Sequence, residues 1–531
     1  MFRLENLENK RECLEDFFLW LFDDDRIKDK SIFLNSEVDL SLCHDYLDSN
    51  IYYPNQLKNF FQTKPMIRLS KISQLGLVIN HSENLYHNRL EHSKGVYNRK
   101  VEELFYKFQN PDYKKYIEDN NLKLYLIADL IKMAGHDIGH PPFSHAMEKE
   151  LFGFIGAHEI IGQRIMLENS EIRKCIDSIS PDLYEILKEL YEKDVLNFRA
   201  HNESNYDVDR LDYLSRDSLY LGYLTHLPTQ KYKTVETSNN KLIDVYDYSS
   251  LSEIEKTLTL REQLYQDIYY SLNTNVYESC LQPFIKALTS SKSIVGKELI
   301  NFIDYMKTTP IENIDLDKYI NFNEIDLYSN LLEIAEKHEN KDIRDLSTML
   351  IPNMKSFLNI IYSHLKLNCK IYSNSEKEFL KKIKKLLNPD NTLSNNIRNK
   401  YFASNNTLVL PSSNNELLGD NSLISSKNGK IKCYKISEPI YVKDIDDKIY
   451  ELSNHPQKSI DWKNRVRLVE TNLVYIPFLR YNGISEKTIN SLKKLYPTAT
   501  KLIQNNLNNK CDVNLSPLSV GHNIEDKFLE L

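Results

Sequence analysis

Apolar residues recur every third or fourth position along most of this chain, which is the pattern of helices that bury one face. The clearest run covers residues 122–134, where Leu122, Leu126, Leu130 and Ala134 are spaced by four. This spacing predicts a core helix. Similar patterns predict helices over residues 7–22, 96–108, 157–164, 253–272 and the second half of 202–217.

The second half of the chain has a less regular pattern. Apolar runs at 299–306, 328–335 and 354–367 predict helices within residues 280–400, and 403–430 is rich in Asn, Ser and Gly, as linkers are. Short β-type runs follow at 431–436, 439–442 and 465–476, and then a short helix and a polar tail over 480–531. The predicted fold class is mostly α, with a smaller C-terminal α+β section.

Composition narrows the function classes. With 531 residues, the chain is too long for one compact core, and 13 glycines are few for a loop-rich β architecture. The net charge of −7 argues against broad nucleic-acid binding, so nucleic acid is not expected as the main substrate. Seven scattered cysteines, no signal peptide and no long apolar run predict a cytoplasmic protein that does not cross a membrane.

The segment 134–145, AGHDIGHPPFSH, concentrates metal-ligand side chains. The adjacent His136 and Asp137 offer an imidazole and a carboxylate, both ligands of first-row transition metals. Gly139 and the two prolines that follow His140 are expected to end the core helix. His140 and His145 would then lie on an irregular segment, where catalytic side chains are often presented.

Four other segments carry candidate partners. His92 lies near the start of a predicted helix, and His158 begins another. Asp209, Tyr213 and Asp217 are four apart and share one helix face, as do Arg261, Tyr265 and Tyr269. Taken singly, each has a plainer interpretation: a hydrogen-bonded structural histidine, a solvated charged face, or aromatic core packing.

Taken together, the residues resemble a known family. His92, His136-Asp137 and Asp209 match the H…HD…D pattern of HD-domain metal phosphohydrolases. The flanking sequences HNRLEHSKG, GHDIGHPPFSH and DVDRLDYLSRD are similar to the dNTP triphosphohydrolase branch, which includes bacterial dGTPases and the animal SAM-and-HD-domain enzymes. The resemblance covers residues 66–285 and implies a helical HD phosphohydrolase core there. The other expected domains are an N-terminal helical extension, 1–65, with no recognisable SAM domain, a helical lobe, 286–402, and an α+β section, 403–531, of regulatory role.

The resemblance also implies roles for individual residues. The metal ligands would be His92, His136, Asp137 and Asp209, holding one divalent transition metal (Mn, Fe or Zn), and Mg would accompany the substrate triphosphate. The residues that serve the reacting phosphate would be His140, His145 and His158, with Glu148 in place of the family's aspartate. Among these, His145 is our choice of general acid. The substrate contacts would be Gln74, Leu75, Arg89, Arg210 (a lysine in the animal enzyme), Tyr213, Asp217, Arg261 and Tyr269.

The activity implied by the resemblance is hydrolysis of a dNTP to a deoxynucleoside and inorganic triphosphate. An activating nucleotide, a homo-oligomer (dimer, tetramer or hexamer) and a role in lowering dNTP pools, for example in antiviral defence, are expected from the family alone. Two alternatives stay open. One is another HD-type nucleotide phosphohydrolase with a different phosphate product, and the other is a non-catalytic nucleotide sensor.

Overall fold

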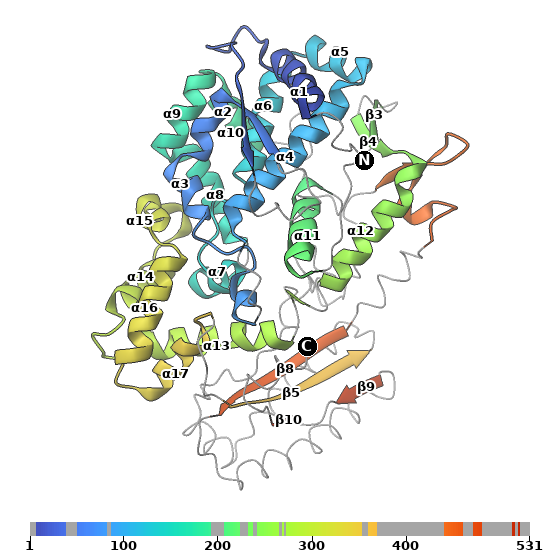
Figure 1. The fold of residues 1–531 in the computed structure, drawn as a ribbon. Coiled ribbons are helices and arrows are strands. Elements are labelled where there is room, and N and C mark those ends of the chain that lie inside the picture. The colour runs from blue at the N-terminus through green and yellow to red at the C-terminus, as the bar shows by residue number, and fades with distance from the viewer. Residues whose placement is uncertain are drawn as a thin grey trace. The chain divides into compact units, whose positions relative to one another are not determined.

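The computed structural model of the chain is mostly helical, as predicted (Figure 1). It describes residues 7–38, 50–81, 87–154, 156–192, 207–222, 232–236, 242–264, 268–269, 272–352, 359–368, 440–459, 471–480, 512–515 and 519–520. The described residues form two compact units. The first contains residues 1–264, 305–327 and 436–459, and the second contains 265–304, 328–435 and 460–531. The four predicted domain ranges remain predictions.

The first unit carries all of the sequence motifs up to Arg261. Its helices are α1 (Leu7–Phe22), α2 (Asn55–Phe61), α3 (Lys64–Leu69), α4 (Arg89–Phe108), α5 (Pro111–Asp119), α6 (Lys123–Ala134), α7 (Ser144–Phe152), α8 (Ala157–Glu168), α9 (Ser170–Ile179), α10 (Leu183–Glu192), α11 (Val208–Tyr220), α12 (Leu251–Leu264) and α15 (Leu316–Asn321). Two antiparallel strands, β1 (Leu34–Val38) and β2 (Asn50–Pro54), form a small sheet. A second sheet has the order β3 (Tyr232–Glu236), β4 (Leu242–Tyr246), β6 (Tyr441–Lys443), β7 (Ile449–Glu451).

Three of these helices meet in one apolar cluster. Val96 of α4, Met133 of α6 and Val208 of α11 are each at most 2% exposed and pack together. The predicted metal ligands are close to these residues in sequence: His92 is one turn before Val96, His136 is three residues after Met133, and Asp209 follows Val208. Burial of the three apolar side chains therefore also brings the three ligands together.

The predicted helix over residues 7–22 is confirmed as α1, and aromatic side chains fix it against α4. The ring of Phe17 lies 6.2 Å from that of Phe105 and 5.6 Å from that of Phe108, both edge-on. Trp20 lies 5.0 Å from Phe108, and its Nε1 donates to Glu118 of α5. Aromatic pairs at such distances add stability beyond area burial. These contacts explain why α1 belongs to the first unit.

Helices and strands both contribute to the second unit. Its helices include α13 (Leu272–Thr289) and α17 (Lys341–Met349), while α14 (Lys297–Thr308) and α16 (Glu324–Lys337) each run from one unit into the other. The strand β5 (Asn359–Asn368) pairs with β8 (Thr471–Arg480), β9 (Asp512–Leu515) and β10 (Ser519–Val520), all antiparallel. The predicted runs at 299–306 and 328–335 lie within α14 and α16.

The helix predicted over residues 354–367 is wrong where the structure describes it, because 359–368 is the strand β5. The run NIIYSHLKLN contains β-branched and aromatic residues and ends in strict alternation of His364, Leu365, Lys366 and Leu367. That period of two is the pattern of a strand. Strands at 512–515 and 519–520 likewise lie within the predicted polar tail, whereas residues 403–430, 431–436 and the helix predicted after 480 lie outside the described residues.

Two boundaries near the central motif also differ from the prediction. The core helix α6 ends at Ala134 with Gly135 at its C-cap, so it stops before Gly139 and the prolines. His145 is the second residue of α7 rather than part of an irregular segment. Of the helix predicted over 253–272, the structure describes α12 up to Leu264. Among the described helices, none combines the length and apolar character needed to span a membrane.

Candidate active site

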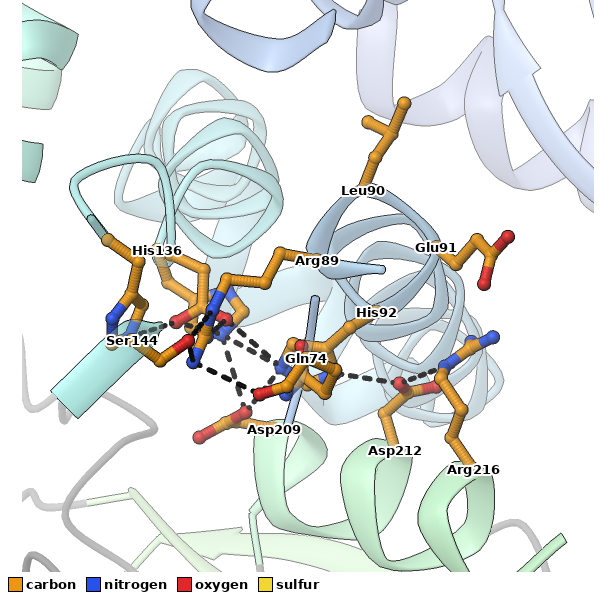
Figure 2. A network of polar contacts seen from close by, with 12 residues as sticks. Gln74, Arg89, Leu90, Glu91, His92, His136, Ser144, Asp209, Asp212 and Arg216 are labelled. Atoms are coloured by element: carbon orange, nitrogen blue, oxygen red, sulfur yellow. Dashed lines mark hydrogen bonds and ion pairs between the residues drawn. The ribbon is translucent and has the colours of Figure 1, made fainter. Parts of the chain in front are cut away.

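Three ligand atoms from α4, the α6–α7 segment and α11 converge on one point (Figure 2). His92 Nε2 lies 3.2 Å from His136 Nε2 and 3.0 Å from Asp209 Oδ1, and His136 Nε2 lies 3.3 Å from the same oxygen. Ligand atoms about 2.1 Å from one ion are separated by about 3.0–3.4 Å, depending on geometry. Leu90 and Glu91, on the same turn of α4, point away from this cluster.

The other ring nitrogens of both histidines have defined partners. His92 Nδ1 donates to Asp212 Oδ2 at 2.8 Å, and His136 Nδ1 donates to the carbonyl oxygen of Met133 at 2.9 Å. A neutral imidazole that donates through Nδ1 has a lone pair on Nε2. When both imidazoles are neutral, two lone pairs and a carboxylate oxygen of Asp209 therefore face one another with no donor among them, which is an arrangement that suits a cation.

The electrostatics of the cluster agree with this geometry. Burial alone would lower the pKa of His92, but hydrogen bonds to Asp209 and Asp212 raise that pKa to about 10. Burial opposes ionisation of Asp209 too, yet His136 and His92 hold its pKa well below the ordinary range. Positive charge is thus strongly favoured at the point between the three side chains, and a divalent ion meets this requirement with its own charge.

Asp137, the fourth predicted ligand, lies beside the three. Its oxygens are 3.4 Å from His136 Nε2 and 3.6 Å from His92 Nε2. Arg89 Nη1 donates a hydrogen bond to Asp137, while the same guanidinium donates to Ser144 Oγ at 2.9 Å and to the Gln74 carbonyl at 3.4 Å. Despite burial, Arg89 and His136 hold the pKa of Asp137 well below its ordinary range. Arg89, predicted as a phosphate contact, therefore also orients this carboxylate.

A second cluster contains the other three motif histidines and Glu148. Their ligand-type atoms lie within 4.8 Å of one another. The rings of His140 and His158 are stacked with centroids 3.9 Å apart, and His145 stands edge-on to both, at 4.9 and 5.2 Å. His140 Nε2 lies 3.3 Å from Asp137 Oδ1, which places the two clusters next to each other.

Glu148 is the fully buried centre of this second cluster. Its Oε2 accepts from His145 Nδ1 at 3.0 Å, and its Oε1 accepts from His158 Nδ1 at 2.9 Å and from the backbone N–H groups of His158 and Gly156. Because both oxygens are occupied by donors, Glu148 orients two imidazoles rather than offering a free metal ligand. Burial opposes its ionisation, but the bonds from His145 and His158 hold its pKa far below the ordinary range.

Exposure distinguishes the three histidines. The His145 side chain is 44% exposed, against 2% for His140 and 10% for His158. Burial, together with the charge of Arg89, lowers the pKa of His140 well below its ordinary value, so this ring is neutral at physiological pH. His145 is therefore the ring of the three best placed to meet a molecule that enters from solvent.

The predicted substrate residues belong to both units. Asp217 on α11 is buried and bonded to His87, whose Nε2 lies 2.7 Å from Asp217 Oδ1. Arg210 is ion-paired with Asp207, the N-cap of α11. Other candidates of the first unit are half-buried Gln74, Leu75 and Tyr213 and buried Arg261. Tyr269 is half-buried and belongs to the second unit.

Several residues of the site were not predicted. Asp212 holds His92 and is itself bonded to Arg216, which is fully buried. Gly95 on α4 permits this approach, because a Cβ there would lie 2.0 Å from Asp212 Oδ1. The available signal was the Asp-to-Arg spacing of four, a helical ion pair. His87 was a second omission: its ring stacks on Tyr220 at 4.3 Å, and only its position before Arg89 could have indicated it.

Comparisons with known proteins agree with this picture. No family model matches the chain. The chain is 30% identical over 217 residues to the uncharacterized protein YwfO of Bacillus subtilis, covering 39% of this chain and 46% of that protein. It is 28% identical over 266 residues to a putative HD domain-containing protein, L394, of Acanthamoeba polyphaga mimivirus, covering 46% and 57%. It is also 29% identical over 201 residues to a SAMHD1 homolog of Dictyostelium discoideum named as a deoxynucleoside triphosphate triphosphohydrolase, covering 35% and 37%.

The alignments thus span about half the length of the curated relatives. Among solved structures, a phosphohydrolase from Bacteroides thetaiotaomicron matches with a TM-score of 0.57 at 20% identity, over 84% of this chain and all of that one. A hypothetical protein from Aquifex aeolicus matches with a TM-score of 0.50 at 18% identity, over 87% and 100%. At these identities the structural likeness concerns the fold alone. The resemblance to HD-domain proteins and the mostly helical phosphohydrolase fold are confirmed.

Proposed function

We propose, on the basis of the HD-type resemblance, that this chain is a metal-dependent dNTP triphosphohydrolase that converts a dNTP and water to a deoxynucleoside and inorganic triphosphate. The observation that carries the proposal is the pairing of two adjacent clusters, one of converging cation ligands and one of histidines around a buried carboxylate. Phosphoryl hydrolysis needs both a cation for the phosphate charge and a proton donor for the leaving oxygen.

The cation would be held by His92, His136 and Asp209, with Asp137 beside them. A divalent Mn, Fe or Zn ion supplies Lewis acidity, which polarises a phosphoryl oxygen and makes water a better nucleophile near neutral pH. The donor set of two imidazoles and carboxylates suits these metals better than Mg, which would accompany the substrate triphosphate.

The protein's own groups would supply the proton. When water attacks the α-phosphorus, the bond from that phosphorus to the 5′-oxygen breaks, and the leaving oxygen takes up a proton. His145 would donate it from Nε2, because its Nδ1 is bound to Glu148. The neighbouring His140 and His158 would face the charge of the α-phosphate, and Arg210, Arg261 and Tyr213 would contact the rest of the nucleotide.

Product analysis tests this proposal directly. The purified protein is incubated with each dNTP singly, with Mn, Fe, Zn or Mg, and the products are separated by anion-exchange chromatography. Inorganic triphosphate and a deoxynucleoside in equal amounts support the proposal. Orthophosphate or pyrophosphate as the product would instead favour another HD-type phosphohydrolase acting on monophosphates, cyclic dinucleotides or guanosine polyphosphates.

The second alternative is a nucleotide sensor that binds without turnover. The bonding of both Glu148 oxygens to His145 and His158 argues for a working site, since binding alone does not require oriented proton donors. Nucleotide binding without turnover under every metal tried would favour the sensor. Lowering of dNTP pools, for instance in antiviral defence, is the biological role we propose for the enzyme.

A further inference from the structure

The segment between two histidines of the second cluster contains an unusual backbone conformation. Phe143 and Ser144, between His140 and His145, have φ angles of 60° and 50°, in the left-handed region. Residues with side chains rarely adopt this region, and two in succession must be held there by their surroundings. Ser144 Oγ also accepts a hydrogen bond from Arg89, whose guanidinium is bonded to Asp137 as well. The bend therefore helps to position the side chain that pairs with Asp137.

The surroundings that hold this bend come from a distant part of the chain. Glu324, 181 residues after Phe143, is 5% exposed, and its Oε1 accepts from the Phe143 backbone N–H at 3.0 Å. The same oxygen accepts from Ser73 Oγ at 2.9 Å. Ser73 precedes Gln74, a predicted substrate contact. One buried oxygen therefore joins the loop before α7 to the loop that carries Gln74.

Neighbours of Glu324 reinforce this contact. Tyr319 donates through its hydroxyl to the carbonyl of Gly139 at 2.6 Å, and the Glu324 backbone N–H donates to Lys71 O at 3.2 Å. Arg68 Nε donates to Phe322 O at 3.0 Å. All these residues belong to the first unit. The segment 319–324 lies beyond residues 66–285, so the sequence resemblance assigns it no role.

We propose that Glu324 is a positioning residue, whose single acceptor oxygen fixes the bend at Phe143 and the Ser73 turn so that His140 and His145 face each other. The kinetic part of this inference rests on the proposed function. Burial raises the pKa of the Glu324 carboxyl, which favours its neutral form. The neutral amide of glutamine, which keeps the acceptor oxygen, is therefore a close substitute for it.

Three variants separate the possibilities. Glu324→Ala removes both hydrogen bonds, Glu324→Gln keeps the acceptor oxygen, and Ser73→Ala removes one bond of the two. Asp317→Ala, at an exposed position on α15, is the matched control. Each protein is examined by hydrogen–deuterium exchange of peptides covering residues 70–76 and 140–152, by metal analysis, by circular dichroism and by steady-state kinetics. The exchange measurement does not depend on which reaction the protein catalyses.

In Glu324→Ala we expect faster exchange over residues 143–146, unchanged metal content, and a fall in kcat of about tenfold or more, larger than any change in KM. Glu324→Gln and Asp317→Ala should resemble the starting protein in exchange rate, metal content and kcat. Over residues 143–146, Ser73→Ala should exchange at the same rate as the starting protein. Unchanged exchange and kcat in Glu324→Ala would overturn the proposal, as would a Gln variant as impaired as the Ala variant. Should Glu324→Ala fail to fold, normal exchange over 70–76 in Ser73→Ala would overturn it. If no dNTP is hydrolysed by any protein while the exchange result holds, the proposed function fails and the positioning role stands.

Discussion

His92 Nδ1 lies 2.8 Å from Asp212 Oδ2, and Arg216 Nε lies 3.0 Å from that same oxygen. The imidazole, the carboxylate and the guanidinium thus form a buried chain that runs from the centre of the site into the α4–α11 contact (Figure 2). Because the carboxylate holds the Nδ1 proton, it fixes which ring nitrogen is directed at Asp209 and His136. The direction of this candidate ligand atom is thereby set by a residue outside the candidate ligand set.

The first prediction concerns this chain. Replacing Asp212 by Asn keeps the size of the side chain but removes its charge, so the His92 ring becomes a weaker and less well oriented ligand. We expect metal affinity to fall by about 10- to 100-fold. Isothermal titration calorimetry with the metal ion measures this affinity, and Glu159→Gln, at an exposed position, is the control. Equal affinities in the starting protein and the Asn variant would mean that Asp212 has only a packing role.

A second prediction concerns the ligands themselves. His136→Ala, Asp137→Ala and Asp209→Ala should each abolish turnover and metal content while leaving circular dichroism largely unchanged. Asp137→Ala should also lower Tm more than Asp209→Ala, because it leaves the buried Arg89 without its carboxylate. Inductively coupled plasma mass spectrometry gives the metal content. Full occupancy in Asp137→Ala would remove Asp137 from the ligand set.

The parts of the site that could be predicted are those in which several metal-ligand residue types lie within one short segment. His136, Asp137 and His92 could be proposed as ligands because metal-ligand residue types cluster in one segment or lie near the start of a predicted helix. Asp212 and Glu324 could not be found in this way, since a carboxylate that binds protein atoms looks the same in sequence as a solvated one. What distinguishes them is burial and partners, and the partner of Glu324 at Phe143 is 181 residues away.

The fold shows the same division. The helix over 7–22 was predicted to the residue and the helix over 122–134 to within one residue, because local periodicity determines which face is buried. The strand β5 was missed because its hydrophobic run is short and continuous at its start, where helix and strand cannot be separated by period alone. Its ten-residue pairing with β8, more than 100 residues later, is a non-local contact that no window of sequence contains.

A third prediction uses the acid dependence of stability. The pKa of Glu148 in the folded protein lies far below its ordinary value of 4.5. A carboxylate with a depressed folded-state pKa stabilises the fold fully above the unfolded-state pKa, and this stabilisation is lost as pH falls below that value. The Tm advantage over Glu148→Gln should therefore shrink as pH is lowered from about 6.5 to about 3.5. A Tm difference that stays constant over this range would contradict the ionised state of Glu148.

A fourth prediction concerns regulation. Residues 1–65 and 286–531 lie outside the part of the chain that the family resemblance covers, and related enzymes use such regions for effector nucleotides and oligomerisation. We predict that one nucleotide accelerates hydrolysis of another, in a dimer, tetramer or hexamer. Rates are measured for each dNTP alone and in all pairwise mixtures, with light scattering to follow the mass. Mixtures whose rates equal those expected from simple competition would refute activation.

The final prediction concerns sugar choice at Tyr269, a residue that the structure assigns to the second unit. In the resembled family, a tyrosine at the matching position packs where a ribose would carry its 2′-hydroxyl. A ring there excludes the hydroxyl by overlap and leaves it desolvated without a partner, which costs about 1–3 kcal/mol, or about one to two decades in kcat/KM. Tyr269→Ala should reduce the preference for dNTPs over rNTPs by that factor.

The alternative is that Tyr269 only packs in the protein interior and that Tyr265 or Tyr270 faces the sugar. Tyr265→Ala and Tyr270→Ala are therefore the matched controls, because they remove the same ring from adjacent positions of one segment. A sugar contact changes the ratio of the two kcat/KM values, whereas a packing role lowers Tm and affects both substrates equally. A Tyr269→Ala protein with a lower Tm and an unchanged dNTP-to-rNTP ratio of kcat/KM would show that the ring only packs. A changed ratio in Tyr265→Ala or Tyr270→Ala would assign the sugar contact to that residue instead.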